Sequence, residues 1–241
     1  AQSVIWHKDE HVIGLTKLSG IPGQGGTKVE RHIDGLLDAL MFDAKEKPRL
    51  VHRLDRDTSG VLLLARTRKV ASTLGKVFRT RSARKIYWAL VAGVPRPAQG
   101  RIAMTLQKQA GPQGDRVRAV QENTEGAQHS VSYYSVIGKA GEKFAWVSLK
   151  PVTGRTHQLR VHMAEIGHPI IGDGKYGNEG VFPGGDIDNK LHLHARRLTF
   201  PHPAGGQLDV TAPLPDHMRR TWEMLNFDTR DGDANTDHLD P

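Results

Sequence analysis

Apolar and polar side chains alternate over much of the chain, with the two-residue period of strands that face a core on one side. Turn residues separate these stretches at short intervals, which is typical of hairpins. Strands are predicted at residues 3–7, 11–17, 60–66, 84–92, 130–138, 143–152, 190–200 and 207–213. The basic segment 106–120 is broken by Gly and Pro, so it is predicted to form a loop or hairpin that reaches into solvent.

Four other stretches carry apolar residues at helical spacing. They cover residues 31–42, 68–81, 156–169 and 215–227. The second stretch has Val70, Leu74 and Val77 on one side and basic residues on the other, and Thr156 is the expected N-cap of the third. Because strands dominate, the expected fold is α+β, with a mixed, mainly antiparallel central sheet flanked by helices.

The composition is that of an ordinary globular protein, with 37% hydrophobic and 25% charged residues among 241. No apolar run approaches the roughly 20 residues of a membrane helix, and the first residues lack the layout of a signal peptide. No membrane partner is therefore expected. The chain has no cysteine, which excludes disulfides and thiolate metal sites and favours a reducing, cytoplasmic location.

The net charge of +8 is unevenly distributed. The segment from Lys45 to Lys85 holds thirteen lysines and arginines against three acidic residues, a local net charge of +10. Such a field suits a polyanion such as nucleic acid, although a solvated basic face is the alternative. The last residues, 228–241, hold five aspartates against one arginine and are predicted to form a disordered acidic tail after a single domain over residues 1–227.

The segment HRLDRDTSG, residues 52–60, places Asp55 and Asp57 next to Arg53 and Arg56, directly before an apolar strand. A guanidinium favours the charged form of a nearby carboxylate, which suits a nucleophile or a general base. A surface turn with solvated ion pairs is the simpler alternative. Farther along, Arg155 stands where a strand is expected to give way to a helix, so its long side chain can reach across a cleft.

Four histidines, His162, His168, His192 and His194, raise the possibility of a metal-dependent hydrolase. Their spacing matches no recognised zinc motif, and no set of acidic partners accompanies them. We therefore predict core or RNA-facing histidines and assign no metal site. The glycine-rich segment 18–28 lacks the GK[ST] ending of a nucleotide-binding loop and is predicted to be a flexible edge.

Four separated motifs occur in the order HRLDRDTSG, KIYWALVAG, PVTGRTHQLRVHMAEIGHPIIGDGKYG and LHLHARRLTFPHP. In this order they resemble the RluA/RluC/RluD-type pseudouridine synthases over roughly residues 4–225. The resemblance implies a catalytic domain with the pseudouridine synthase fold. Two features depart from the family pattern: the usual Lys-Pro-x-Gly opening appears as KLSG, without a proline after Lys17, and the 241 residues contain no S4-type RNA-binding module.

By this resemblance, Asp55 corresponds to the essential aspartate, which acts covalently or as a base on a uridine flipped out of its helix. Tyr87 matches the tyrosine that stacks on the uracil and can take the C5 proton, and Arg155 matches the arginine that pairs with the carboxylate. Arg53 resembles the residue that fills the gap left by the extruded base. Asp57 is the competing carboxylate and is assigned to the turn. Residues 168–177 are implied to support the cleft.

The implied activity is that of an isomerase that converts uridine to pseudouridine in RNA, with 23S ribosomal RNA of the large subunit, or its precursor, as the expected partner. The reaction breaks the N1–C1′ bond and forms C5–C1′ without redox change, so it requires no nucleotide cofactor or metal. Phosphate contacts are expected from the basic residues that follow HRLDRDTSG in the sequence: Arg66, Arg68, Lys69, Lys76, Arg79, Arg81 and Arg84. A transfer RNA or dual-specificity enzyme, and a non-catalytic RNA-binding or ribosome-assembly protein, are the alternatives.

Overall fold

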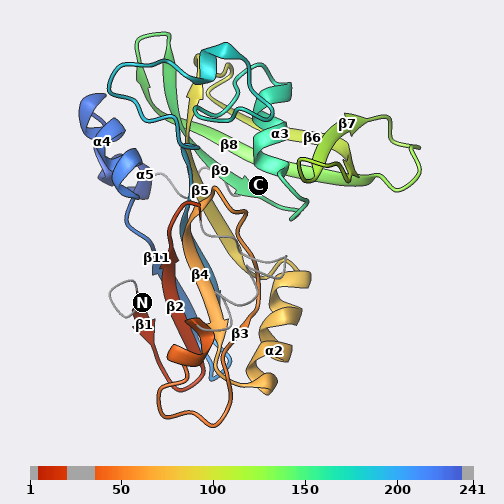
Figure 1. Ribbon diagram of the computed structural model, residues 1–241, viewed down its shortest axis with the longest axis vertical. Coiled ribbons are helices and arrows are strands. Elements are labelled where there is room, and N and C mark those ends of the chain that lie inside the picture. Colours follow the sequence, from red (N-terminus) through yellow and green to blue (C-terminus); the bar gives the residue numbers. More distant parts are fainter. Residues whose placement is uncertain (1–4, 21–35, 235–241) are drawn as a thin grey trace. The chain divides into compact units, whose positions relative to one another are not determined.

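The computed structural model describes residues 5–20 and 36–234 (Figure 1). The chain forms two compact units: unit 1 comprises residues 1–85 and 194–215, and unit 2 comprises residues 86–193 and 216–241. Two of the three boundaries between the units fall inside the strands at residues 84–92 and 193–201, and the third lies directly before the helix that begins at Asp216, which explains why no linker is visible in the sequence. In both units the strands outnumber the helices and most pairs are antiparallel, which confirms the expected α+β class.

Unit 1 is a small mixed sheet with one long helix. Its elements are β1 (Ile5–Lys8), β2 (Val12–Lys17), β3 (Arg49–Leu50), β4 (Ser59–Ala65), α2 (Arg68–Arg79), β10 (Leu193–Pro201) and β11 (Gln207–Thr211). The strand order is β1-β2-β4-β10, with β3 paired to β4 and β11 paired to β10. The β4–β10 pair is parallel, and the other pairs of this unit are antiparallel.

Strand β4 is apolar throughout because both faces of the unit 1 sheet are covered. Val61 and Leu63 pack with Val70 and Leu74 of α2 on one face. Leu62 and Leu64 pack on the other face with Leu37 and Leu40, which belong to the stretch predicted as a helix at residues 31–42. In the described residues, 36–39 are helical, and most of the glycine-rich segment 18–28 lies outside the description.

Unit 2 is an antiparallel sheet in the order β5-β9-β8-β6-β7. Its elements are β5 (Arg84–Ala92), β6 (Gln99–Gln109), β7 (Arg116–Val120), β8 (Gln128–Ala140), β9 (Phe144–Pro151), α3 (Gln158–Glu165), the 3-10 helix η2 (Glu179–Val181), α4 (Asp216–Met224) and α5 (Thr229–Ala234). The segment predicted as a loop or hairpin is the hairpin β6–β7. Strand β6 begins at Gln99, well before the predicted segment.

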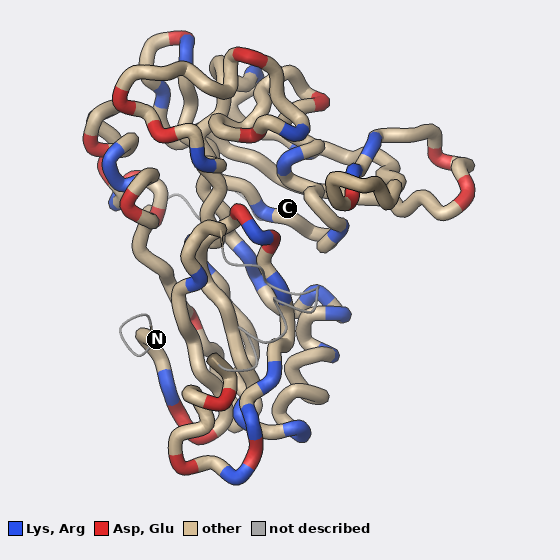
Figure 2. The backbone as a smooth tube through the Cα atoms, in the orientation of Figure 1, with Lys and Arg blue, Asp and Glu red and all other residues tan. Residues whose placement is uncertain are grey.

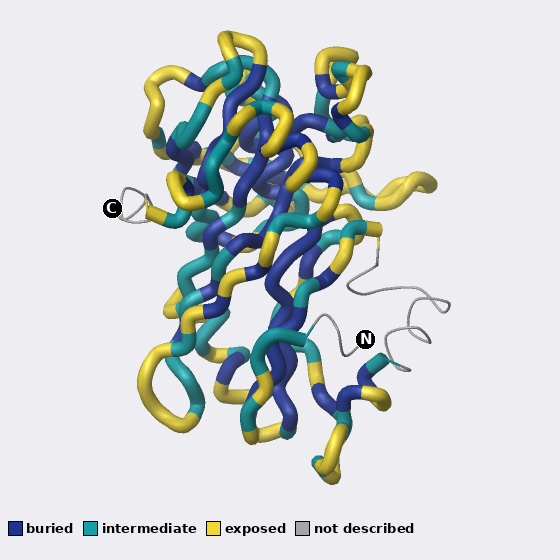
Figure 3. Tube along the Cα trace, turned by 90° about the vertical axis from the view of Figure 1, so that its left-hand side faces the viewer, coloured by how far each residue is buried: buried dark blue, intermediate teal, exposed yellow. Residues whose placement is uncertain are grey.

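Two apolar layers cover the unit 2 sheet (buried residues are dark blue in Figure 3). Leu159 and Met163 of α3 pack on Val91 and other strand residues of one face. The opposite face carries an aromatic cluster in which Trp146 lies 4.9 Å from Trp88 and 5.6 Å from Trp222, measured between ring centroids. This cluster is closed by α5, because a Cβ added at Gly232 would lie only 2.3 Å from the Trp146 ring.

The disordered tail predicted from residue 228 is therefore wrong over residues 228–234. Thr229–Ala234 form α5, and Gly232 is buried against the tryptophans. The expectation rested on five aspartates, but a short helix with one small residue at the contact needs little apolar surface of its own to dock. Residues 235–241 lie outside the described residues. In the described chain, no helix has the length and apolar character needed to cross a bilayer.

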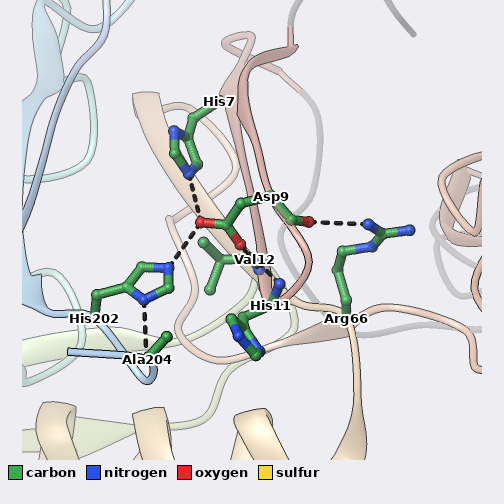
Figure 4. Close-up of polar contacts among 7 residues, drawn as sticks. All are labelled: His7, Asp9, His11, Val12, Arg66, His202 and Ala204. Carbon is green, nitrogen blue, oxygen red and sulfur yellow. Dashed lines mark hydrogen bonds and ion pairs between the residues drawn. The ribbon is translucent and has the colours of Figure 1, made fainter.

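The half-buried carboxylate of Asp9 connects two turns of unit 1 (Figure 4). Asp9, in the turn after β1, has its Oδ2 atom 2.9 Å from His7 Nε2 and 2.7 Å from His202 Nε2. Its Oδ1 atom accepts hydrogen bonds from the backbone N–H groups of His11 and Val12. His202 Nδ1 accepts from Ala204 N, so the His202 proton sits on Nε2 and is donated to Asp9.

These contacts predict an acid-dependent loss of stability. Burial disfavours the charged form of Asp9, but the hydrogen bonds outweigh burial and hold the pKa of Asp9 well below its ordinary value. A depressed pKa stabilises the fold above the unfolded pKa of about 3.9, and this stabilisation is lost as the pH falls below it. We expect Asp9→Asn to lower the free energy of unfolding by about 1 kcal/mol at pH 7.

The difference between the wild type and Asp9→Asn should shrink as the pH is lowered from about 5 to about 3, as measured by urea denaturation at each pH. Asp38→Asn is the control, because the Asp38 side chain is 64% exposed in its ion pair with Lys47. A difference that stays constant down to pH 3 would contradict the role given to the Asp9 charge.

Candidate active site

The acid loop, residues 52–58, connects β3 to β4 in unit 1. Asp55 is half-buried, and Asp57 and Arg56 are exposed. The loop turns back on itself through a hydrogen bond from Thr58 N to Asp55 O of 3.1 Å. Gly60, at the start of β4, has φ +127°, and a Cβ there would lie 2.2 Å from the carbonyl oxygen of Ala195 in β10. Only glycine fits so close to β10, and this fixes the exit of the loop.

Lys17, at the end of β2, binds the main chain of the acid loop. Its side chain is buried, and Nζ donates to the carbonyl oxygens of Arg56 (3.0 Å) and Leu18 (3.1 Å). Gly20 N also donates to Arg56 O, at 2.8 Å. Burial lowers the pKa of Lys17 to about 8, against the opposing charges of Asp57 and Asp55. Lys17 therefore keeps a largely protonated ammonium beside both carboxylates at pH 7.

A neutral histidine backs the acid loop. The ring of His52 stacks on Phe78 of α2, with 4.9 Å between centroids, and its Nε2 atom accepts a hydrogen bond from Leu63 N of β4. Burial, with a smaller contribution from the charge of Lys85, lowers the pKa of His52 to about 3. His52 thus serves as a rigid hydrogen-bond acceptor that joins the loop to the neighbouring strand, and it stays uncharged at physiological pH.

Tyr87 and Arg155 belong to unit 2, whereas Asp55 belongs to unit 1. Tyr87 lies near the start of β5, is half-buried, and pairs with Leu149 of β9. It packs on the same core as Ala89 and Val91, as strand alternation predicts. Because β9 runs antiparallel to β5 and ends at Pro151, Tyr87 lies at the end of the β5–β9 pair from which the chain continues to Arg155.

The loop that carries Arg155 is organised by Gln158, the first residue of α3. Gln158 Oε1 accepts from Arg155 N at 3.1 Å and from the Thr153 hydroxyl at 2.5 Å, and its amide nitrogen donates to Val131 O at 2.9 Å. The guanidinium Nε of Arg155 donates to His129 O at 3.1 Å. The loop is thus bonded to β8 on both sides of the arginine.

The expected N-cap, Thr156, is incorrect: the N-cap of α3 is His157, in a left-handed conformation with φ 52° and without a side-chain cap. The side chain of Gln158 takes over part of the capping by accepting from Arg155 N. The sequence pattern located the start of the helix to within two residues but not the left-handed conformation of His157.

Residues 168–177, which the resemblance implies to support the cleft, are held in place by a buried ion pair, and their role stays a prediction. Asp173 is buried and pairs bidentately with Arg160 of α3, with distances of 2.7 and 3.0 Å. Asp173 Oδ1 also accepts from the backbone N–H groups of Lys175 and Tyr176. The ion pair therefore holds this segment on α3 through Arg160, which follows Arg155 by five residues in the chain.

The basic residues expected to contact RNA are among the lysines and arginines drawn in blue in Figure 2, and they differ in exposure. Arg53 is exposed. Five basic residues on or directly after α2 are exposed as well: Arg68, Lys69, Lys76, Arg79 and Arg81. Arg84 is half-buried at the start of β5. The prediction that Arg66 contacts RNA is wrong, because Arg66 is buried and its guanidinium binds Asp43 Oδ1 and the carbonyl oxygen of Asp9.

The four histidines considered as metal ligands are engaged in the folded chain. His162 is fully buried between the hydroxyls of Ser130 and Ser132, and burial lowers its pKa to about 4. His194 Nδ1 lies 2.8 Å from the Ser59 hydroxyl. His192 contacts the hydroxyl of Thr221, and His168 contacts the carbonyl oxygen of Ala92. No group of three or more potential ligands is placed to hold a metal within the described residues.

Comparison with known proteins identifies the family. The sequence profile described as RNA pseudouridylate synthase matches residues 11–165, a span that contains Asp55, Tyr87 and Arg155. The chain therefore belongs to the RNA pseudouridylate synthase family.

The dual-specificity RNA pseudouridine synthase RluA of Salmonella typhi is 38% identical and is covered over 92% of its length by 88% of this chain. The mitochondrial RNA pseudouridine synthase 4 of Arabidopsis thaliana is 34% identical over 97% of this chain, but the chain spans only 62% of its length. The solved structure of human RNA pseudouridylate synthase domain containing 4 shares the fold, with a TM-score of 0.77, 28% identity, and coverage of 93% of this chain and 94% of that chain.

The cytoplasmic location expected from the absence of cysteine is contradicted. Relatives from Arabidopsis thaliana, Oryza sativa and Xenopus tropicalis are named as mitochondrial proteins. The mitochondrial matrix is also a place where thiols stay reduced, so a lack of cysteine does not distinguish it from the cytoplasm. The cysteine count therefore carries no information on the compartment of this chain.

Proposed function

We propose that the chain is an RNA pseudouridine synthase, an isomerase that converts uridine to pseudouridine in a structured RNA. The observation that carries the proposal is the family match over residues 11–165, together with a half-buried Asp55 on a loop that is fixed through its main chain. A catalytic carboxylate must be held in place without losing its access to substrate, and this loop meets both requirements.

The proposed chemistry begins at the carboxylate of Asp55, which attacks the nucleoside or removes a proton from its sugar. The N1–C1′ glycosidic bond breaks, the uracil rotates, and C5 bonds to C1′. The proton on C5 then leaves to a base and N1 gains a proton, so that product and substrate have the same composition. Arg155 supplies a cation for the carboxylate in this scheme, and Tyr87 supplies the aromatic face on which the uracil stacks. These assignments rest on the motif resemblance.

The basic face of unit 1 suits the RNA backbone in this proposal. The exposed residues Arg68, Lys69, Lys76, Arg79 and Arg81 lie on or directly after one helix, so a phosphate-lined surface can contact them together. Extruding a base costs a few kcal/mol, and stacking on an aromatic ring returns roughly 1–3 kcal/mol. Contacts to phosphate supply the remainder without reading the sequence.

For the substrate we propose large-subunit ribosomal RNA, because a relative from Escherichia coli O157:H7 is named ribosomal large subunit pseudouridine synthase C. The Salmonella typhi relative, which the chain covers almost completely, is named a dual-specificity enzyme, and this favours a second candidate function in which transfer RNA is modified as well.

The test uses the full chain with transcripts that carry tritium at uracil C5. Because pseudouridine formation releases the C5 proton, turnover appears as tritium in the solvent, and carbodiimide mapping then locates the modified positions. We expect release from transcribed large-subunit ribosomal RNA, and release from a transfer RNA pool as well if the enzyme has dual specificity. Binding of both RNAs without tritium release from either would contradict the proposal and favour a non-catalytic RNA-binding protein.

A further inference from the structure

Unit 2 contains a cleft of about 320 Å³ between strand β7 and helix α3. Arg116 and Arg118 of β7 line one side, and Glu165 of α3 lines the other, with Tyr176 at one end. Two buried valines, Val117 of β7 and Val161 of α3, also line the cleft. This volume lies at the lower end of small-ligand sites and suits a group the size of one nucleotide.

The charges around the cleft are available to a ligand. In the chain that the structure describes, Arg118 and Glu165 take part in no ion pair or side-chain hydrogen bond. Arg116 and Arg118 are two residues apart on a strand, so both guanidinium groups lie on the same face of β7. The Arg116 guanidinium carbon lies 5.5 Å from the centroid of the Tyr176 ring, a contact that restrains its position.

The cleft is also bonded to the loop that carries Arg155. The Tyr176 hydroxyl accepts from Val117 N of β7 at 3.1 Å and lies 2.6 Å from His157 Nδ1. The hydroxyl therefore bonds to the main chain of β7 and to the ring of His157 at the same time. His157 follows Arg155 by two residues, and one tyrosine therefore joins the cleft wall to the arginine loop.

We propose that this cleft is a subsite for a nucleotide that flanks the reacting uridine in the RNA substrate, which rests on the proposed function. Arg116 and Arg118 bind its phosphate, and its base lies against Val161 and Ala164 of α3 with an exocyclic amine directed to Glu165. A carboxylate only accepts hydrogen bonds, so at ring position 4 of a pyrimidine it favours the amine of cytosine over the carbonyl oxygen of uracil. The subsite thus discriminates against uracil at that position.

The test measures RNA binding alone, by fluorescence anisotropy with 5′-labelled octacytidylate and octauridylate at several KCl concentrations. We expect the wild type to bind octacytidylate about tenfold more tightly than octauridylate. Glu165→Ala should remove this preference. Arg118→Ala should weaken the binding of both oligomers and lower the slope of log K against log salt by about 0.7, the value for one phosphate contact on a single strand.

Two further variants separate the cleft from a general basic surface. Ala164→Leu fills the cleft without changing charge, so it should reduce the preference for cytidine but keep the salt slope. Arg101→Ala is the matched control, because Arg101 is an exposed arginine of unit 2 outside the cleft, and it should leave both quantities unchanged.

Equal binding of the two oligomers by the wild type, an unchanged preference in Glu165→Ala, or an equal fall in salt slope in Arg101→Ala would overturn the proposal. This test measures RNA binding and not turnover. A chain without isomerase activity would contradict the proposed function, and the binding result could still be interpreted. Conversely, an active enzyme with no cytidine preference would overturn the subsite alone.

Discussion

Replacing Asp55 by asparagine is expected to lower the rate of pseudouridine formation by more than about a thousandfold. Asparagine keeps the size of the side chain but cannot act as a nucleophile or general base at neutral pH. The fold of the loop should persist, because it depends on the main-chain bond from Thr58 N to Asp55 O and on Lys17 Nζ bound to Arg56 O. Single-turnover tritium release, with RNA binding and melting temperature measured alongside, checks this expectation.

Asp57→Asn is the matched control, since the two carboxylates are two residues apart and both act on the charge of Lys17. The Asp57 side chain is exposed, and the contact that this residue makes to Ser19 goes through its carbonyl oxygen. Its activity should therefore stay within about threefold of the wild type. An active Asp55→Asn variant, or an Asp57→Asn variant that alone is inactive, would show that the reacting carboxylate is assigned to the wrong residue.

The second large effect is expected on stability. Asp173→Asn removes the counter-charge of Arg160 in an ion pair whose side chains are 0% and 9% exposed, respectively. Breaking a buried pair from one side leaves an uncompensated charge, which typically costs about 3–5 kcal/mol. We expect the free energy of unfolding, measured by urea denaturation, to fall by that amount.

Asp228→Asn provides the comparison, because the Asp228–Arg230 pair has the same chemistry and a short distance of 2.6 Å but an arginine side chain that is 88% exposed. Water solvates this arginine when its partner is lost, so the loss of stability should be far smaller than that of Asp173→Asn. Similar small losses for both variants would mean that the Arg160–Asp173 pair is solvated in solution, contrary to its burial in the fold.

The sequence predicted the structure well where the pattern of apolar and polar side chains determines which of them are buried. The helix predicted at residues 68–81 is α2 at Arg68–Arg79, with Val70 and Leu74 buried as expected, because an amphipathic period reports directly on packing. Strand β4 was readable for a similar reason: it is buried on both faces, and its apolar run is therefore unbroken. The first half of β6 was missed because exposed residues such as Arg101 interrupt its apolar positions.

The candidate site shows the corresponding limit. Motif order located Asp55, Tyr87 and Arg155, and their roles remain predictions. The contacts that hold the acid loop could not be predicted from the sequence. Lys17 binds backbone carbonyl oxygens, and every residue type carries a backbone carbonyl oxygen. Arg66 illustrates the reverse case: its charge suggested a phosphate contact, whereas its guanidinium binds an inner carboxylate and a carbonyl oxygen. Whether a cation faces inward or outward depends on tertiary neighbours that its own sequence position does not encode.

Main-chain anchoring of the acid loop has a practical consequence for following the enzyme at work. Since Lys17 and Gly20 grip the carbonyl oxygen of Arg56, the exposed side chain at position 56 contributes nothing to that grip. The chain has no cysteine of its own, so a single thiol introduced there would be the only labelling point. A fluorophore attached at that position would report the arrival of RNA one residue away from Asp55 while the loop keeps its shape.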